Sequence, residues 1–274
     1  MCIRDRYGEV HLVNGKVHSI IEKPINPAKG YINAGVYVFK PHVFDYIART
    51  EKSPRGEYEI TTTLSLMLKD TAMEAYEIHE WNEIGYPWDM LSLNEKLMKE
   101  IRGKVEGEVE PHATLKGEVM VGQGSVIRSG AYIIGPVVIG EECEIGPNCL
   151  IRPYTTVGNH CKIGAACEVR NSLIMDGSHI PHHNYVGDSI IGRNCNLGSG
   201  TKIANLRLDE KSVHVTVKGK SVDSRRRKLG AIIGDNVKTG INVSIDVGTT
   251  IGEGSFIGPG AVVRGSVAPY SKVF

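Results

Sequence analysis

Long apolar runs, aromatic side chains and an excess of charge of either sign are all scarce in this sequence of 274 residues. No run of about 18 apolar residues occurs, so no transmembrane helix is expected. The opening MCIRDRYGEV lacks the apolar segment of a secretory signal, and we expect a cytoplasmic protein. Lys and Arg number 32 against 31 for Asp and Glu, a formal net charge of +1. This balance favours neither a nucleic-acid partner nor a membrane partner.

The cysteines lack the Cys-x-x-Cys spacing that is typical of a zinc site. Cys143 and Cys149 are six residues apart, as are Cys161 and Cys167. Each precedes an aliphatic residue by two positions. We therefore predict that these cysteines are buried small apolar residues.

What is abundant is a repeat of six residues. From Val109 to Val169, every sixth residue is Val, Ile or Leu, which makes eleven positions in succession. The period returns over 191–203, and again over 233–263 with Thr239 as its one polar member. Such self-similarity is interpreted before local structure. Six residues suit a short strand and a two-residue corner, and three such units make a triangular coil of about 18 residues whose strands stack about 4.8 Å apart.

The stretch IGPNCLIRPYTTVGNHCKIG resembles the hexapeptide repeats of left-handed parallel β-helix acyltransferases. The left hand comes from this resemblance alone. We expect a mainly β fold, with a left-handed parallel β-helix over residues 105–274 preceded by a partial α/β domain over residues 7–102.

The segment 7–102 shows mixed α/β signals. Alternating apolar residues around Asn14-Gly15 predict a β-hairpin. YINAGVYVF is interpreted as a buried strand. HVFDYIART, ITTTLSLMLKD and LSLNEKLMKEI are interpreted as helices, and the last is expected to end at Gly103.

IIEKP, YINAGVYVF, GEYEIT and WNEIGYPWDML resemble the C-terminal half of sugar-phosphate nucleotidyltransferases. The resemblance places Glu22, Lys23, Asn33 and Gly35 in a sugar pocket, and Glu83 at a magnesium-binding position. The family's Gly-rich G-x-G-x-R loop, which holds the nucleotide phosphates, is missing from the sequence. We therefore expect a domain that begins partway, with no nucleotidyl transfer by this chain alone. UTP or dTTP and Mg²⁺ would belong to the full-length protein.

The stretch SHIPHHNYVGD, residues 178–188, interrupts the six-residue period with three His and a Tyr. A damaged repeat, a metal site and a catalytic segment are the three interpretations. Because Met175 and Tyr185 are ten residues apart, we interpret the stretch as a loop that leaves the solenoid.

IRPYTTVG, EVRNSLI, HHNYVGDSIIG, NCNLGSGTKIANL and AIIGDNVKTGINVSI resemble archaeal bifunctional sugar-1-phosphate nucleotidylyltransferase/acetyltransferases. The resemblance implies transfer of an acetyl group from acetyl-CoA to the amine of an amino-sugar 1-phosphate, in a homotrimer with sites between subunits. It makes His182 the general base, a role that suits the ordinary pKa of histidine, and Glu168 the acid that orients its imidazole. The substrate contacts that it implies are Arg152, Arg170, Tyr185, Asn196, Asn205 and Lys211.

The segment KSVHVTVKGKSVDSRRRK suspends the period and alternates around Lys218-Gly219, which predicts a projecting hairpin arm. We interpret its basic run, 225–228, as solvated; contact with coenzyme A phosphates or with a neighbouring subunit is the alternative.

Two other functions stay open. β-Helix carbonic anhydrases hold zinc with three His, and His179, His182 and His183 make that class worth naming. Related two-domain chains also serve as non-catalytic or regulatory subunits. Neither the amino sugar nor the acyl group is determined by the sequence.

Overall fold

The structure is a computed structural model that describes residues 7–24 and 30–274. The chain divides into two compact units, Met1–Asn82 and Glu83–Phe274, which are described separately. No helix in the described ranges is long and apolar enough to cross a membrane.

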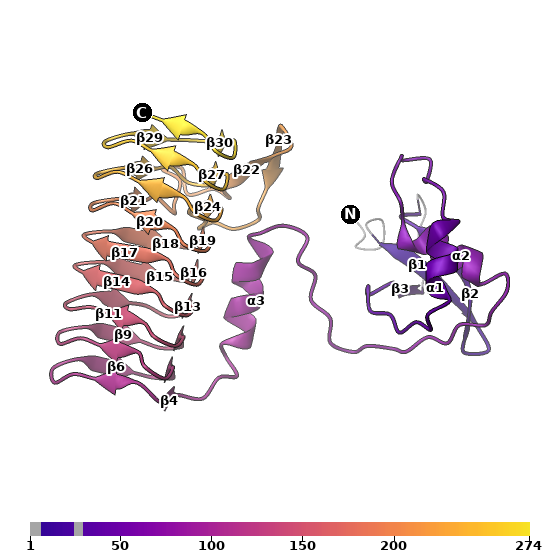
Figure 1. The fold of residues 1–274 in the computed structure, drawn as a ribbon, viewed down its shortest axis with the longest axis horizontal. Coiled ribbons are helices and arrows are strands. Elements are labelled where there is room, and N and C mark those ends of the chain that lie inside the picture. The colour runs from indigo at the N-terminus through magenta and orange to yellow at the C-terminus, as the bar shows by residue number, and fades with distance from the viewer. Residues whose placement is uncertain (1–6, 25–29) are drawn as a thin grey trace. The chain divides into compact units, whose positions relative to one another are not determined.

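The second unit is a three-sided parallel β-solenoid, as the six-residue period predicts (Figure 1). Each side is one sheet, and successive strands along the chain pass from the first sheet to the second and then to the third. The first sheet contains β4 (Lys104–Val105), β7 (Val119–Val121), β10 (Val137–Ile139), β13 (Thr155–Val157), β16 (Leu173–Ile174), β19 (Ile190–Ile191), β24 (Ile232–Ile233), β27 (Thr250–Ile251) and β30 (Ser266–Val267).

The other two sheets complete each coil. The second sheet contains β5 (Glu108–Val109), β8 (Val126–Ile127), β11 (Glu144–Ile145), β14 (Lys162–Ala165), β17 (His179–His182), β20 (Asn196–Leu197), β25 (Lys238–Thr239), β28 (Phe256–Ile257) and β31 (Lys272–Val273). The third contains β6 (Thr114–Lys116), β9 (Tyr132–Ile134), β12 (Leu150–Ile151), β15 (Glu168–Arg170), β18 (Tyr185–Gly187), β21 (Lys202–Ile203), β26 (Ser244–Ile245) and β29 (Val262–Val263).

The aliphatic residues of the period form the core of the solenoid. Ile145 pairs with Ile163 on the next coil, and both are 0% exposed. A column of mostly aliphatic buried side chains keeps the coils in register, because a slip by one residue would turn the apolar set outward. Cys143, Cys149, Cys161 and Cys167 are buried free thiols in this core, as predicted, while Cys2 lies outside the described residues.

The stretch 178–188 is not a loop, and that interpretation is wrong. β17 and β18 are regular members of the second and third sheets, paired with β14 and β15. The cause is a change of phase: Ile174 follows Val169 by five residues instead of six, and the core positions then continue at Ile180 and Val186. A corner shortened by one residue looks like a break when positions are counted strictly in sixes.

Helix α3 (Asp89–Leu97) lies against the first sheet (Figure 1). Trp88 and Leu91 are buried in a cluster with outward residues of that sheet, such as Ile190. The compact units therefore divide before α3, at Asn82/Glu83. The reason is that the apolar face of α3 finds its partner on the solenoid.

The predicted hairpin arm is present as the antiparallel pair β22 (His214–Val217) and β23 (Lys220–Asp223). It is inserted between β21 and β24, at the corner from the third sheet to the first. Val213 and Val215 are buried in the same cluster as Leu91 of α3. The base of the arm is thereby fixed to the helix and to the solenoid.

The described residues of the first unit form a small sheet in the order β2-β1-β3 and two helices. The hairpin predicted at Asn14-Gly15 joins β1 (Gly8–Val13) to β2 (Lys16–Glu22), and both turn residues have positive φ. The helices are α1 (Val43–Ala48) and α2 (Ile60–Met67), which share a core that includes Tyr46 and Leu64.

The strand predicted for YINAGVYVF extends over only two residues, β3 (Tyr31–Ile32). In the described ranges β1 is its one pairing strand, and the ladder covers Glu9–Ile32 and Val10–Tyr31. Val36 and Val38 beyond it are 71% and 99% exposed. The interpretation as a buried strand is wrong for these residues, because without a ladder partner the alternating pattern cannot be buried.

Candidate functional site

Five of the predicted site residues lie on or beside four consecutive strands of the third sheet. Glu168 and Arg170 are on β15, Tyr185 is on β18, Arg152 follows β12 directly, and Asn205 lies two residues after β21. The ladder pairs Glu168 with Tyr185 and Arg170 with Gly187. Residues about one coil apart in sequence are therefore neighbours in space, because each coil adds one strand to the sheet.

Arg152 and Glu168 form an ion pair on this face. Arg152 Nη1 donates to Glu168 Oε1 at 3.1 Å, and the two side chains are 41% and 33% exposed. Glu168 is predicted to orient the imidazole of His182. In the part of the chain that the structure describes, no hydrogen bond joins Glu168 to His182, and the carboxylate of Glu168 contacts Arg152.

Asp188 is the buried carboxylate of the cluster. The residue is 2% exposed, and its Oδ2 accepts a hydrogen bond from Asn205 Nδ2 at 2.5 Å. Arg170 Nε lies 3.7 Å from the same oxygen. Its Oδ1 accepts from Asn171 Nδ2 at 2.9 Å. The sequence analysis gave Asp188 no role, because burial is not visible in a single sequence. Its only signal in the sequence is its place at the end of the H-x-x-Y-x-G-D run.

Tyr185 adds a phenol to the cluster. Burial raises the pKa of Tyr185 most, the carboxylates of Glu168 and Asp188 add to that rise, and Arg170 and the amide of Asn205 oppose it. The phenol is therefore neutral near pH 7 and can donate a hydrogen bond. A Cβ at Gly187 would lie 2.8 Å from Tyr185 Oη and 2.7 Å from Asn205 Nδ2, so only glycine leaves room for this close approach.

His182 is the last residue of β17 and lies at the corner between the second and third sheets. It pairs with Ala165, its carbonyl oxygen accepts from the Gly200 N–H at 3.1 Å, and the residue is exposed. The imidazole is thus reachable from solvent beside the strand that carries Tyr185. His179 is exposed on the same strand, and His183 occupies the corner with φ 54°.

The three histidines do not form a metal cluster. Within residues 7–24 and 30–274, no group of three or more His, Cys, Asp or Glu side chains is placed to hold a metal ion. The structure of the single chain therefore adds nothing to the zinc interpretation.

Two predicted contacts lie away from the third-sheet cluster. Asn196 is exposed on β20 of the second sheet, where it pairs with His179. Lys211 is exposed in the segment before the arm, and its backbone N–H donates to Asp209 Oδ1 at 3.3 Å. Within one chain the structure connects neither residue to the cluster.

Part of the basic run 225–228 is bound within the chain, which corrects its interpretation as solvated. Arg226 Nη2 contacts Glu95 Oε1 on α3 at 2.6 Å, and Arg226 Nη1 donates to Ser92 Oγ at 2.8 Å. Arg227 pairs with Glu210. Glu95 Oε1 also accepts from Asn171 Nδ2 at 2.8 Å, so the arm, α3 and the corner that holds Asp188 are joined.

In the first unit, the sugar-pocket residues expected from the resemblance lie together. Glu22 and Asn33 meet at Gly8, where an added Cβ would lie 3.2 Å from Glu22 Oε2 and 3.4 Å from Asn33 Cβ. Lys23 Nζ lies 4.0 Å from Glu22 Oε1, and the Gly35 N–H donates to Asn33 Oδ1 at 3.1 Å.

Glu83, the expected magnesium ligand, belongs to the other compact unit. In the first unit, Glu22 faces the cations of Lys23 and Arg55. Among the described residues, no group of three or more His, Cys, Asp or Glu side chains that includes either residue is placed to hold a metal ion. The described residues therefore offer no ready-made donor set for Mg²⁺, which takes oxygen ligands from carboxylates and substrate phosphates.

A three-sided solenoid of six-residue repeats is the fold of hexapeptide-repeat proteins. Family comparisons agree: residues 230–265 match the bacterial transferase hexapeptide model (six repeats), residues 133–230 match the GMPPB C-terminal domain, and residues 4–100 match the nucleotidyl transferase model.

Individual relatives are more specific. The chain is 46% identical over 239 residues to a bifunctional sugar-1-phosphate nucleotidylyltransferase/acetyltransferase of Sulfurisphaera tokodaii, covering 86% of this chain and 60% of that protein. It is 48% identical over 241 residues to the bifunctional protein GlmU of Methanococcus maripaludis, covering 86% and 58%. The chain spans 58% to 60% of the length of these two relatives.

Among solved structures, a UDP-N-acetylglucosamine acyltransferase from Campylobacter jejuni is 16% identical, covering 62% of this chain and 70% of that chain with a TM-score of 0.33. That likeness is too weak to bear on the site.

Proposed function

We propose that this chain transfers an acetyl group from acetyl-CoA to the amine of an amino-sugar 1-phosphate. The observation that carries the proposal is the third-sheet cluster, which gathers Arg152, Arg170, Tyr185 and Asn205 beside the corner that holds His182. Two guanidinium groups suit a phosphate, while a phenol and an amide suit sugar hydroxyls. The similarity to two proteins named as bifunctional, one of them a sugar-1-phosphate nucleotidylyltransferase/acetyltransferase, supports the same chemistry.

The residues divide the work as follows. The amine nitrogen attacks the thioester carbonyl carbon of acetyl-CoA, and the C–S bond breaks to release the thiolate of coenzyme A. The imidazole of His182 accepts the proton that the nitrogen loses, and the thiolate is protonated in turn. Because His182 is exposed on the single chain, we propose that a neighbouring subunit of a homotrimer closes the site around it.

Replacing His182 tests this role. We expect His182→Ala to lower kcat for acetyl transfer about 100- to 10,000-fold, the usual contribution of a general base. The circular dichroism spectrum should not change, because the side chain is exposed. The measurement is release of the coenzyme A thiol with glucosamine 1-phosphate, galactosamine 1-phosphate and a further amino-sugar 1-phosphate in parallel.

His179→Ala is the matched control, since His179 is an exposed histidine on the same strand. It should keep activity within about twofold of the wild type. Near-full activity of His182→Ala would show that His182 is not the base. If the wild-type chain also fails to bind acetyl-CoA in calorimetry, the non-catalytic alternative is favoured.

We also make a proposal about the first compact unit, most of which matches the nucleotidyl transferase model. The printed sequence carries no G-x-G-x-R loop, and among the described residues no group of three or more possible metal ligands is placed together. We therefore expect no pyrophosphorolysis of UDP- or dTDP-sugars by this chain alone. Measurable release of UTP or dTTP would contradict this.

A further inference from the structure

The carboxylate of Asp188 is buried at the third-to-first corner, between the proposed substrate site and the helix that packs on the solenoid. A carboxylate on a residue with 2% exposure is stable only where hydrogen bonds and cations replace its water. Three neighbours do so here: Asn171, Asn205 and Arg170.

The two oxygens of Asp188 face different partners. Oδ2 faces the proposed site, where Asn205 Nδ2 is 2.5 Å away and Arg170 Nε is 3.7 Å away. Oδ1 faces away from it, toward Asn171, whose amide also donates to Glu95 on α3. The carboxylate is therefore anchored on one side and contacts two proposed substrate ligands on the other.

A carboxylate only accepts hydrogen bonds, so it selects one orientation of the amide of Asn205. The NH₂ group must point to Asp188, so the carbonyl oxygen of Asn205 points away from the carboxylate. The same charge holds the guanidinium of Arg170, whose Nε has no other polar partner among the described atoms.

We propose that Asp188 is a positioning residue that fixes the amide of Asn205 and the guanidinium of Arg170 for binding of the acetyl acceptor. The inference rests on the proposed function, because it assumes that these two residues bind the amino-sugar 1-phosphate. Asp188 itself is buried behind them and touches neither substrate.

The test compares the steady-state kinetics of the Asp188→Asn variant of this chain with those of the wild-type chain. An amide in place of the carboxylate offers one acceptor and a competing donor, so Asn205 can turn over and Arg170 loses its charge partner. We expect KM for the amino-sugar 1-phosphate to rise at least about tenfold, while KM for acetyl-CoA stays within about twofold.

Asn171→Ala is the control for a purely structural effect. It removes a hydrogen bond from the same carboxylate but leaves the Asn205 contact in place. It should lower the melting temperature and leave both KM values within about twofold. If Asp188→Asn changes KM for the acceptor no more than Asn171→Ala does, the proposal is overturned.

A double-mutant cycle with Asn205→Ala gives an independent reading. If Asp188 acts through Asn205, adding Asp188→Asn to Asn205→Ala should raise KM for the acceptor by much less than it does in the wild type. Full additivity would contradict the proposal. If Asp188→Asn does not fold, the same double-mutant cycle is measured with Asp188→Ser, whose shorter side chain leaves room for a water.

The two proposals fail in different ways. If the wild-type chain acetylates no amino-sugar 1-phosphate, the proposed function fails. If the wild type is active and Asp188→Asn keeps a wild-type KM for the acceptor, only the positioning role of Asp188 fails.

Discussion

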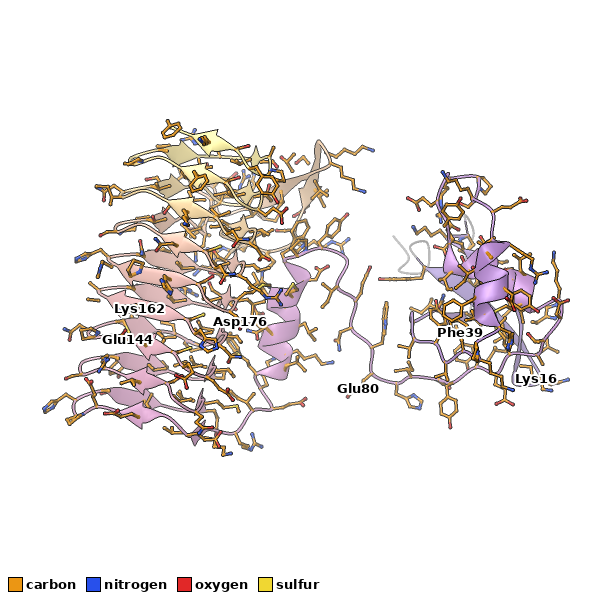
Figure 2. All side chains as sticks on the ribbon, in the orientation of Figure 1. Lys16, Phe39, Glu80, Glu144, Lys162 and Asp176 are labelled. Carbon is orange, nitrogen blue, oxygen red and sulfur yellow. The ribbon has the colours of Figure 1, made fainter. Side chains whose placement is uncertain are left out.

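On the second sheet, charged side chains that are about one coil apart in the sequence contact each other, because successive coils stack. Arg128 Nη1 lies 2.7 Å from Glu110, and Lys162 Nζ lies 2.9 Å from Glu144. Arg128 Nε also reaches Glu144 at 3.4 Å, so the four side chains form a ladder over successive coils. Figure 2 shows Glu144 and Lys162 on the outside of neighbouring coils.

This ladder makes stability depend on pH. The hydrogen bond from Lys162 lowers the pKa of Glu144 below its ordinary value of 4.5, with Arg128 adding to the effect. A carboxylate whose pKa is lowered in the folded state stabilises the fold at pH values above its unfolded-state pKa. That stability is lost as the pH falls through the folded-state pKa.

We expect Glu144→Gln to melt at a lower temperature than the wild type at pH 7. The loss is about 0.2–1 kcal/mol, since the pair is partly exposed and screened by water. The difference in melting temperature between variant and wild type should disappear as the pH falls well below 4.5, where Glu144 of the wild type is itself protonated. Thermal melts from pH 7 to pH 3 measure it. Glu141→Gln, on the same coil, removes an exposed charge outside the ladder and should show a smaller gap at pH 7.

At the scale of elements, packing decides which part of the chain helix α3 belongs to. Its sequence lies within the segment that matches the nucleotidyl transferase model, yet its buried face contacts the solenoid. Asn94 strengthens the contact, because its Nδ2 donates to the Tyr154 carbonyl oxygen at 2.9 Å and its Oδ1 accepts from Thr156 Oγ1 at 2.8 Å.

Two leucines of this region give a matched test. Leu91 is 0% exposed and Leu97 is 55% exposed on the same helix. We expect Leu91→Ala to destabilise the second unit by about 2–5 kcal/mol through lost burial and a cavity. Leu97→Ala should change stability by less than about 0.5 kcal/mol. Chemical denaturation measures both; equal effects would show that α3 does not pack on the solenoid in solution.

At the scale of the whole molecule, the division at Asn82/Glu83 predicts which fragment is self-sufficient. We expect residues 83–274 to unfold cooperatively and to keep acetyl transfer, because α3, the arm and all three sheets are retained. Residues 103–274 lack Trp88 and Leu91, which would expose the apolar surface at Ile190 and Val215.

The comparison is made by circular dichroism melts and light scattering of the two fragments with the full chain as reference. The longer fragment should melt higher than the shorter one and run at three times its monomer mass. A shorter fragment as stable as the longer one would place the boundary near residue 103 after all.

Most of the solenoid could be predicted from the sequence, because the six-residue period is a local pattern that every coil repeats. The neighbourhood of Glu168, Arg170 and Tyr185 follows from the same period once the coils are stacked. The nature of the 178–188 stretch could not be predicted, because a corner one residue shorter shifts the phase without removing any strand.

What the sequence by itself determined is therefore the repeat, the buried column of aliphatic residues, the arm and the residue types available to the site. Tertiary structure alone decided that α3 joins the solenoid, that Glu168 pairs with Arg152, and that Asp188 is a buried carboxylate behind Asn205. The physical reason is that periodicity is set by neighbours along the chain. Burial and charge pairing are instead set by groups that meet only when distant segments pack together.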